Sequence, residues 1–269
     1  MVSIVIPTYN RSQFLKKAID SVIAQTFKDF ELIIVDDGST DNTFHLISQY
    51  SDSRIRYIKQ ENKGPGAARN RGIKESMHGL IAFLDNDDWW DKEKLDIQFR
   101  EMQQNPGYLI SHTQEIWYKN GKLLNQKKKH KKQHGYIFDK CLPLCAVSMS
   151  TAIVRKELFD RIGLFDESMA CCEDYDFWLR TSVNHKFLLI DEPLTLKDGG
   201  RPDQVSSIYA TGIDKFRIQS ILKLLRSNNL TSEQRKLATN ELHKKCRIYG
   251  NGCLKHGKQE EGKRYLNLW

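Results

Sequence analysis

Residues 80–90 read LIAFLDNDDWW, a short apolar run that ends in three aspartates, one asparagine and two tryptophans. A run of this length, bounded by polar residues, is typical of a buried strand over Leu80–Leu84. The aspartates after it allow two interpretations. Acidic side chains that follow a strand are usually turn formers, but carboxylates this close together also repel one another unless a cation lies among them.

Three earlier segments repeat the pattern of a short apolar run followed by polar residues. We expect strands at Ser3–Ile6, Glu31–Val35 and Ile55–Lys59. Helical patterns separate the strands: residues 11–25, a helix after DDGSTDNT (36–43), a third from Pro65 to about Met77, and a fourth over residues 91–105. Asn10, with Gln13 three residues later, is the predicted N-cap of the first helix. This alternation indicates an α/β fold, with a mostly parallel sheet flanked by helices.

The alternation of strand and helix patterns ends after residue 110. Asn120 and Gly121 lie between two apolar flanks and predict a β-hairpin, because its turn needs positive φ angles. A strand, a short helix near residues 155–162 and a longer one over 173–183 should follow. The chain then reads as wholly helical, with a capping box at Thr231 and Gln234. We therefore divide it into residues 1–110, residues 111–211 and a C-terminal helical extension, residues 212–269.

The composition is that of an ordinary globular protein, with 39% hydrophobic and 28% charged residues among 269. No segment approaches the roughly 18 consecutive apolar residues that a membrane span needs, and the first residues lack a signal-peptide pattern. We expect a cytoplasmic protein. The six cysteines have no CxxC spacing, which predicts reduced thiols and disfavours a sulfur-bound metal.

A formal net charge of +8 is compatible with nucleic acid, anionic lipid headgroups or phosphorylated ligands as partners, and equally with a solvated loop and a solvated helix face. Part of the charge lies in KKKHKK, residues 127–132. This run lacks the aromatic residues that single-stranded nucleic acid would stack on, so we expect no nucleic-acid partner. It is either a solvated, mobile loop or a contact with an anionic membrane surface.

The polar residues that follow the strands should share one edge of the sheet. In open parallel sheets, ligands bind beyond the carboxyl ends of the strands, where Pro7–Asn10, Val35–Asp41 and Asp85–Asp88 would meet. Such a concentration of carboxylates suits Mg²⁺ or Mn²⁺, which prefer carboxylate oxygens and share them with substrate phosphates. The Asp85-x-Asp87 spacing lets both side chains point the same way.

A glycine-rich turn, GPGAARNRGI (residues 64–73), follows the third predicted strand. Its helix carries Arg69 and Arg71, which would bring positive charge toward the acidic edge. Gly64 and Gly66 do not form a dinucleotide fingerprint, because Arg69 occupies the third glycine position and the turn follows the wrong strand. The sequence also has no GxxxxGK[ST] loop, which disfavours a P-loop nucleotidase.

Five motifs in order give the chain a family resemblance: VSIVIPTYNR, ELIIVDDGSTDNT, GPGAARNRGI, FLDNDD, and GLFDES followed by EDYDFWLR. Over about residues 1–205 the chain resembles the family 2 glycosyltransferases, which are inverting, nucleotide-sugar-dependent enzymes of the GT-A fold. The resemblance implies that residues 1–110 form the nucleotide-sugar-binding half of a GT-A domain. Residues 111–211 would form the acceptor-binding half.

The resemblance also implies site residues. Pro7, Tyr9 and Asp37 would cradle the nucleotide base, with Arg69 nearby. Asp85 would face the ribose, Asp87 would bind the Mn²⁺ or Mg²⁺ ion, and Asp174 would be the general base. From the residues alone, Asp174 is equally well a carboxylate that complements a helix N-terminus, and Asp176 competes with it for the role of base.

Three further features have two interpretations each. Trp89 and Trp90 either stack on a sugar or pack as a half-buried pair over the sheet edge, and we expect the second. Trp178 should lie in the core. Arg201, in GGRPDQVS (199–206), lies where related enzymes place an acceptor-side loop; it contacts a phosphate or belongs to a flexible turn.

The expected function is metal-dependent transfer, with inversion, of one hexosyl or N-acetylhexosaminyl group from a nucleotide sugar, by preference a UDP-sugar. The acceptor would be a glycan or a lipid-linked sugar of cell-envelope polysaccharide biosynthesis, met by peripheral association with the inner membrane. The chain has no Q-x-x-R-W motif, which favours single addition over polymer synthesis. The alternatives are a nucleotidyltransferase and a non-catalytic module that binds nucleotide sugars or nucleic acid.

Overall fold

A computed structural model describes residues 1–269 except 120, 202 and 269. The strands are β1 (Val2–Thr8), β2 (Phe30–Asp36), β3 (Ile55–Lys59), β4 (Leu80–Phe83), β5 (Asp88–Trp90), β6 (Ile110–Lys119), β7 (Lys122–Leu124), β8 (Ile153–Arg155) and β9 (Phe187–Asp198). The helices are α1 (Ser12–Ile23), α2 (Thr43–Ser48), α3 (Pro65–Glu75), α4 (Lys94–Gln104), α5 (Phe138–Cys141), α6 (Glu157–Ile162), α7 (Glu173–Ser182), α8 (Val205–Ile208), α9 (Ile213–Arg226), α10 (Ser232–Lys255) and α11 (Gln259–Leu266). Two 3₁₀ turns, Lys128–His130 and Met149–Thr151, complete the described elements.

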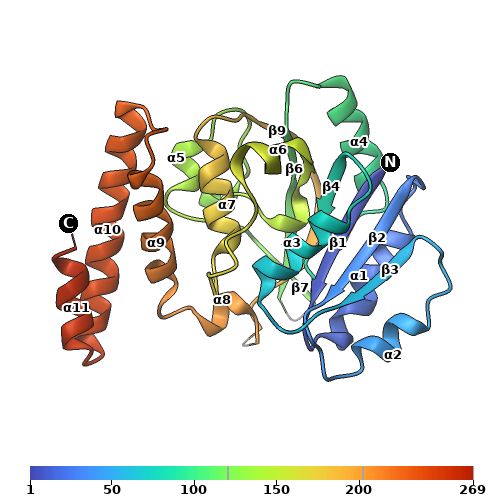
Figure 1. Ribbon diagram of the computed structural model, residues 1–269, viewed down its shortest axis with the longest axis horizontal. Coiled ribbons are helices and arrows are strands. Elements are labelled where there is room, and N and C mark those ends of the chain that lie inside the picture. The colour runs from blue at the N-terminus through green and yellow to red at the C-terminus, as the bar shows by residue number, and fades with distance from the viewer. Residues whose placement is uncertain (120, 202, 269) are drawn as a thin grey trace.

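One sheet runs through the molecule in the order β3-β2-β1-β4-β8-β6-β9-β5, with β7 beside β6 (Figure 1). β1 pairs in parallel with β2 and β4, and β2 pairs in parallel with β3. β8 is antiparallel to both of its neighbours, β4 and β6. The predicted α/β class and flanked sheet are confirmed, and the sheet is mixed on its second half.

The central strands are buried on both faces because helices cover both sides of the sheet. Successive side chains of a strand alternate between faces. Val5, Ile33 and Phe83 accordingly belong to one hydrophobic cluster, which contacts α3 and α7. Ile4 and Ile34 belong to the other, which contacts α1. This explains why β1 and β2 read as continuous apolar runs.

The start of α1 differs from the prediction. Asn10 is not its N-cap: Asn10 has a φ of 51°, and its Oδ1 accepts a hydrogen bond from the backbone N–H of Thr40 at 2.8 Å. The first N–H of the helix, that of Ser12, is accepted instead by the carboxylate of Asp41 at 3.0 Å. A tertiary contact between two loops therefore replaces the local cap. The same contact holds these loops together at the carboxyl end of the sheet.

Gly72 allows α3 to lie directly on β1. A Cβ at this position would lie 2.3 Å from Cγ1 of Val5, closer than any real contact. Because α3 carries Arg69, this close approach determines how far that side chain stands from the sheet.

The tryptophan pair belongs to the sheet. Trp89 and Trp90 lie in β5 and pair with Leu196 and Thr195 of β9. Trp90 is buried and its indole N–H donates to the carbonyl of Ser150 at 2.7 Å, whereas Trp89 is half-buried. The expected packing over the sheet edge is correct, but only one ring is half-buried. Trp178 is in the core, as predicted.

The predicted hairpin is present as the antiparallel pair β6–β7, with Gly121 at a φ of +73°; Asn120 lies outside the described residues. The basic run differs from a solvated loop at its last lysine. Lys132 is buried, with its Nζ 3.1 Å from the carboxylate of Glu115 on β6.

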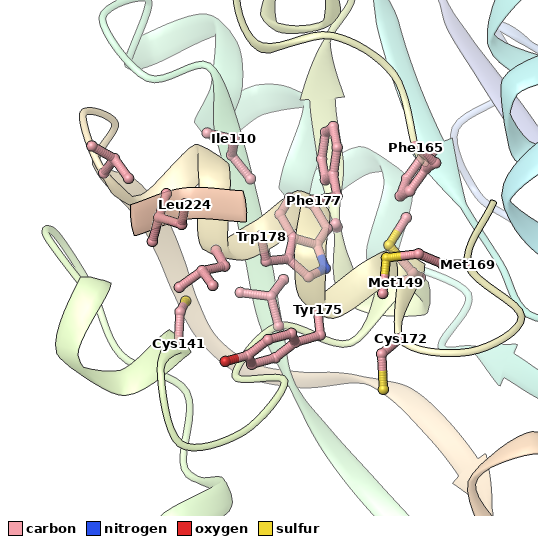
Figure 2. Close-up of a cluster of buried hydrophobic side chains, with 14 of the residues drawn as sticks. Ile110, Cys141, Met149, Phe165, Met169, Cys172, Tyr175, Phe177, Trp178 and Leu224 are labelled. Atoms are coloured by element: carbon pink, nitrogen blue, oxygen red, sulfur yellow. The ribbon is translucent and has the colours of Figure 1, made fainter. Parts of the chain in front are cut away.

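The C-terminal helices α9, α10 and α11 stack beside α7, at the end of the molecule far from β3 (Figure 1). Leu224 of α9 joins the cluster around Trp178 and Phe177 of α7 (Figure 2). The predicted capping box begins α10, with Thr231 and Gln234 bonding each other's backbone N–H groups. Among the described residues, no helix has the length and apolarity that crossing a bilayer requires.

Candidate active site

The carboxyl ends of the strands surround a cavity of about 900 Å³. Its walls come from the loops after β1, β2 and β4, the N-terminal ends of α3 and α7, the end of β9, and helices α8 and α9. Every expected site residue lines it: Pro7, Tyr9, Asp37, Arg69, Asp85, Asp87 and Asp174. The edge predicted from the strand order therefore brings the whole set together.

Asp37 is tied into the loop that precedes α3. One carboxylate oxygen accepts hydrogen bonds from the side chain of Gln60 at 2.7 Å and the N–H of Lys63 at 3.0 Å, and the other accepts from the N–H of Gly64 at 2.8 Å. Asp36 beside it is a structural residue, since its carboxylate accepts from Ser39 and Tyr57. Tyr9 is 47% exposed at the mouth of the cavity, which leaves its ring free to contact a ligand.

Arg69 links the two acidic motifs. Its Nη2 lies 2.8 Å from Asp85, and its Nη1 donates to Glu173 at the start of α7. Burial disfavours the charged guanidinium, but Asp85, Glu173 and Asp174 outweigh it and raise the pKa of Arg69. Burial likewise opposes ionisation of Asp85, and the attraction of Arg69 overcomes it and lowers the pKa of that carboxyl. Arg69 is therefore a permanent cation inside the cavity wall.

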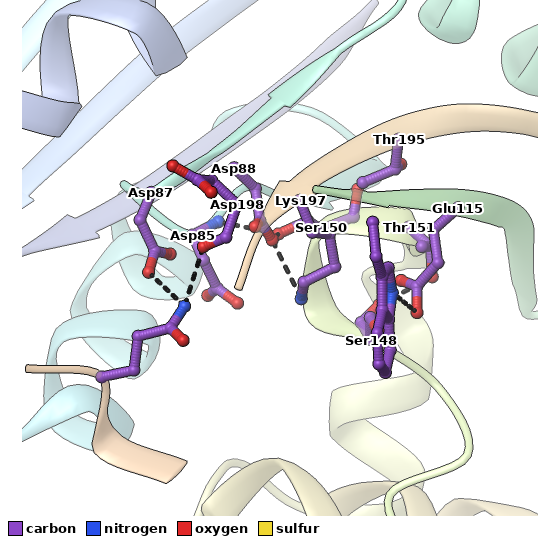
Figure 3. A network of polar contacts seen from close by, with 12 residues as sticks. Asp85, Asp87, Asp88, Glu115, Ser148, Ser150, Thr151, Thr195, Lys197 and Asp198 are labelled. Atoms are coloured by element: carbon purple, nitrogen blue, oxygen red, sulfur yellow. Dashed lines mark hydrogen bonds and ion pairs between the residues drawn. The ribbon is translucent and has the colours of Figure 1, made fainter. Parts of the chain in front are cut away.

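The other two aspartates of the DNDD segment have cations from β9 and the loop after it. Asp88 lies 3.0 Å from Nζ of Lys197 and accepts a hydrogen bond from Ser150 at 2.5 Å (Figure 3). Burial, with repulsion from Asp87 and Asp85, nevertheless raises the pKa of Asp88 to about 8. Asp87 is paired with Arg201, at 2.5 Å, and accepts from Gln204 at 3.2 Å. Arg201, in the loop after β9, thus binds a carboxylate of the protein itself. Pro202, the next residue of this loop, lies outside the described residues.

Asp174 lies at the start of α7 and is half-buried in the cavity wall. One oxygen accepts from the N–H of Tyr175 at 2.6 Å and the other from the thiol of Cys145 at 3.3 Å. The residue before the helix, Cys172, is left-handed with a φ of 66°, a conformation that costs energy for a side chain of this kind. Among the described residues, no cation is bonded to the Asp174 carboxylate, which faces the cavity with only the Tyr175 N–H and the Cys145 thiol as partners.

Asp176, the competing candidate for the base, has a structural role. Its buried carboxylate accepts from Arg180 at 2.8 Å and from Lys223 of α9 at 2.8 Å. It does not line the cavity. Of the two aspartates, only Asp174 reaches the space where a substrate would bind.

The cavity residues that sequence reasoning missed include Lys197, Arg217 and Cys145. Lys197 lies inside a long strand, and Arg217 lies inside a helix that carries several other basic residues, so no local pattern distinguishes them. Their positions depend on how β9 and α9 pack.

The carboxylates fit a divalent ion that is shared with a ligand. Among the described residues no group of three or more His, Cys, Asp or Glu side chains forms a complete metal cage. Asp87 and Asp85 are nonetheless partly exposed in the cavity, at 21% and 28% of the side chain. One or two carboxylates completed by phosphate oxygens and water are the usual environment of Mg²⁺ in phosphate-transfer and related sites.

Comparison with solved structures shows the same fold. The chain matches S. aureus TarS 1–349 in complex with UDP-GlcNAc with a TM-score of 0.78 at 19% identity, over 98% of this chain and 78% of that one. It matches the mannosyltransferase PcManGT of Pyrobaculum calidifontis, in complex with GDP-Man and Mn²⁺, with a TM-score of 0.71 at 13% identity, over 98% of this chain and 73% of that one. The fold is therefore the GT-A fold.

Sequence comparison adds the family. An uncharacterized glycosyltransferase of Rickettsia felis is 38% identical over 201 residues; the match covers 72% of this chain and 32% of that protein, so the chain spans about a third of its length. The Escherichia coli UDP-Glc:alpha-D-GlcNAc-diphosphoundecaprenol beta-1,3-glucosyltransferase WfgD is 33% identical over 183 residues, 66% of this chain and 68% of that protein. The family model for glycosyl transferase family 2 matches residues 3–163. With its motifs gathered around one cavity in a GT-A fold, the chain belongs to glycosyl transferase family 2.

Proposed function

We propose that the protein transfers one hexosyl or N-acetylhexosaminyl group from a UDP-sugar to a hydroxyl group of a glycan or lipid-linked acceptor, with inversion and with Mn²⁺ or Mg²⁺. The observation that carries this proposal is the single cavity into which both Asp87 and Asp174 open. The names of relatives support its finer parts: TarS was solved with UDP-GlcNAc and PcManGT with Mn²⁺. The name of WfgD describes a UDP-glucose donor and a lipid-linked acceptor.

Inverting transfer is a displacement at the anomeric carbon from the face opposite the leaving group. Asp174 would accept the proton of the attacking acceptor hydroxyl as general base. Its oxygens are held in place by the N–H of Tyr175 and the thiol of Cys145, which limits rotation of the carboxylate. Of the two Asp174 oxygens, the one that accepts from Cys145 is held more weakly than the one that accepts from Tyr175, because thiols are weak hydrogen-bond donors.

The donor would bind on the opposite side of the cavity. Pro7, Tyr9 and Asp37 would contact the nucleotide base, with Arg69 close by, and Asp85 would accept hydrogen bonds from the ribose. Asp87 would hold the divalent ion, which when bound supplies positive charge to the departing diphosphate. Arg69, which is buried, and Lys197, which is partly buried, add two cations to the same wall, and these strengthen the attraction for a diphosphate.

Cellular placement is part of the proposal. We place the protein in the cytoplasm, peripherally at the inner surface of the membrane where a lipid-linked acceptor is found. The basic run contains five lysines, at residues 127, 128, 129, 131 and 132, but Lys132 is buried against Glu115 and contributes no surface charge. Flotation with liposomes that contain or lack anionic lipid tests this placement, and equal recovery from both would contradict it.

Product analysis distinguishes the proposed function from its alternatives. Purified protein is incubated with Mn²⁺ and a panel of UDP-, GDP- and dTDP-sugars. Release of UDP supports glycosyl transfer, whereas release of UTP in the presence of diphosphate would indicate a nucleotidyltransferase. No turnover of any donor, with binding retained, would indicate a non-catalytic module. Proton NMR of the transferred sugar then reports the anomeric configuration, and retention would contradict the proposed inversion.

A further inference from the structure

The C-terminal helices form one wall of the cavity beside the proposed base. Ile213 and Arg217 of α9 line the cavity together with Asp174. The guanidinium carbon of Arg217 lies 5.8 Å from the ring centre of Tyr175, the residue next to Asp174. A molecule whose hydroxyl reaches Asp174 therefore has α9 as its neighbour.

Arg217 has hydrogen-bonding capacity to spare. Its Nη1 lies 3.1 Å from Asp214, but Lys245 of α10 shares that carboxylate at 3.3 Å. The Nε–H of Arg217 is buried and has no hydrogen-bond partner among the described residues. Buried polar groups in proteins are almost always satisfied, so the guanidinium of Arg217, which lines the cavity, can donate to a ligand oxygen.

The other strong cations in the cavity are committed to carboxylates of the same wall. Arg69 bonds Asp85 and Glu173, and Lys197 bonds Asp88. The Nε–H of Arg69 also lacks a partner among the described residues, but both of its Nη groups are bonded to carboxylates, whereas Arg217 has one carboxylate and shares it with Lys245. Arg217 is thus the cation best placed to receive an anionic group that enters with the acceptor.

Apolar side chains stand at the mouth on the same side. Val205 and Ile208 of α8 line the cavity yet are 45% and 61% exposed, and Ile213 continues the surface onto α9. A sugar nucleotide offers little hydrocarbon for them to cover. Apolar residues that line a polar cavity and remain exposed indicate a ligand with an apolar part.

We propose that the acceptor is a lipid-linked sugar diphosphate, recognised through Arg217 and the apolar surface formed by Val205, Ile208 and Ile213. This inference rests on the proposed function and assigns its acceptor side. Arg217 donates to a phosphate oxygen, and the apolar surface covers the first carbons of the lipid. The acceptor sugar lies between them and Asp174. Arg217 is a specificity-determining residue, since it bonds the acceptor away from the reacting atoms.

The test compares three acceptors that carry the same N-acetylglucosamine: a diphosphate with a short lipid, a diphosphate with a methyl group, and a neutral alkyl glycoside. Transfer from the donor identified by UDP release is measured as kcat/KM. Arg217→Gln should lower kcat/KM for both diphosphates on the order of 10- to 100-fold, as expected for loss of a charge-assisted hydrogen bond. The loss with the neutral acceptor should be at least tenfold smaller. Arg217→Lys should recover part of the difference.

Matched controls come from the same helical extension. Arg226→Gln removes an exposed cation from the end of α9, and should leave the ratio between acceptors at its wild-type value. Ile208→Ser should weaken use of the lipid diphosphate relative to the methyl diphosphate, and Ile248→Ser, which changes a 53% exposed residue of α10, should not.

Several results would overturn the inference: equal losses on charged and neutral acceptors in Arg217→Gln, the same loss in Arg226→Gln, or a wild-type protein that does not prefer the diphosphates. The wild-type preference is informative even if Arg217→Gln does not fold. Failure of the proposed function looks different, because then no UDP is released from any donor.

Discussion

Arg201 and Asp87 form an ion pair, with Nη2 of the arginine 2.5 Å from the carboxylate. The guanidinium also stacks over Phe14, at 4.1 Å from the ring centre, and Gln204 of the same loop donates to Asp87. The loop after β9 therefore holds the carboxylate that the proposed metal ion uses. A divalent ion and Arg201 compete for it.

Removal of Arg201 should tighten metal binding. In Arg201→Met, Mn²⁺ no longer has to displace a guanidinium from Asp87, and we expect its affinity to rise about three- to tenfold, since a partly exposed ion pair contributes about 1 kcal/mol. Calorimetric titration of the protein with Mn²⁺, without donor, measures the change. Arg54→Met, which breaks the distant pair with Asp52, is the control. Unchanged or weaker binding in Arg201→Met would show that the pair does not oppose the ion.

Asp174 and Asp176 should respond in opposite ways to the same substitution. Asp174→Asn removes the proposed base and should lower kcat by about 10² to 10⁴, with little change in thermal stability. Asp176→Asn weakens the bonds to Arg180 and Lys223 and should lower Tm by several degrees while the folded enzyme keeps most of its kcat. If Asp176→Asn lowered kcat more than Asp174→Asn does, Asp176 and not Asp174 would be the general base.

Gly72 should tolerate no side chain. Gly72→Ala would place a Cβ 2.3 Å from Cγ1 of Val5 and push α3 away from β1, which should cost about 1–3 kcal/mol of unfolding free energy. Gly79→Ala, where nothing lies within 4 Å of the added atom, should be close to neutral. Urea unfolding of both variants measures the difference, and equal stabilities would mean that α3 shifts without strain.

The buried pair of Lys132 and Glu115 should make stability depend on pH. Burial opposes ionisation of Glu115, but Lys132 outweighs it and lowers its pKa to about 2. A carboxylate with a depressed pKa stabilises the fold above its unfolded pKa, and this contribution is lost as the pH falls from about 4.5 to about 2. Lys132→Met should cost about 3–5 kcal/mol at pH 7 by leaving an unpaired buried charge.

The pH profile of that cost is the diagnostic measurement. In denaturant titrations the gap between wild type and Lys132→Met should narrow as the pH falls through this window. Lys131→Met, a change next to it in the sequence at an exposed residue, should leave stability nearly unchanged at every pH. A gap that is constant from pH 7 to pH 2 would mean that Glu115 does not titrate with the pair.

The parts of the fold that follow from hydrophobic pattern were predictable. β1, β2 and β4 are largely apolar runs because both faces of the sheet are covered there. These strands and β3 are parallel, so their carboxyl ends share one edge. That rule alone gathers Asp37, Asp85 and Asp87. The capping box at Thr231 and the hairpin at Gly121 were predictable because their signals are local.

Features that depend on contacts between distant segments were not predictable. Asn10 has the residue type of an N-cap, yet its side chain accepts a hydrogen bond from Thr40, and Asp41 caps the helix instead. The sequence predicts a solvated side chain for Lys132, as for the other lysines of the basic run. The structure places it beside Glu115 of β6. Lys197 and Arg217 line the cavity only because β9 crosses behind the aspartates and α9 packs on α7, and neither packing has a signature in the local sequence.

The three-residue strand β8 connects the two halves of the sheet, since it pairs with β4 on one side and β6 on the other. A protein cut between residues 110 and 111 would leave open strand edges on both fragments, and open edges invite aggregation. A chimera that joins segments of two relatives is therefore best joined after β9. The elements beyond that point are helices, so the junction breaks no hydrogen bond of the sheet.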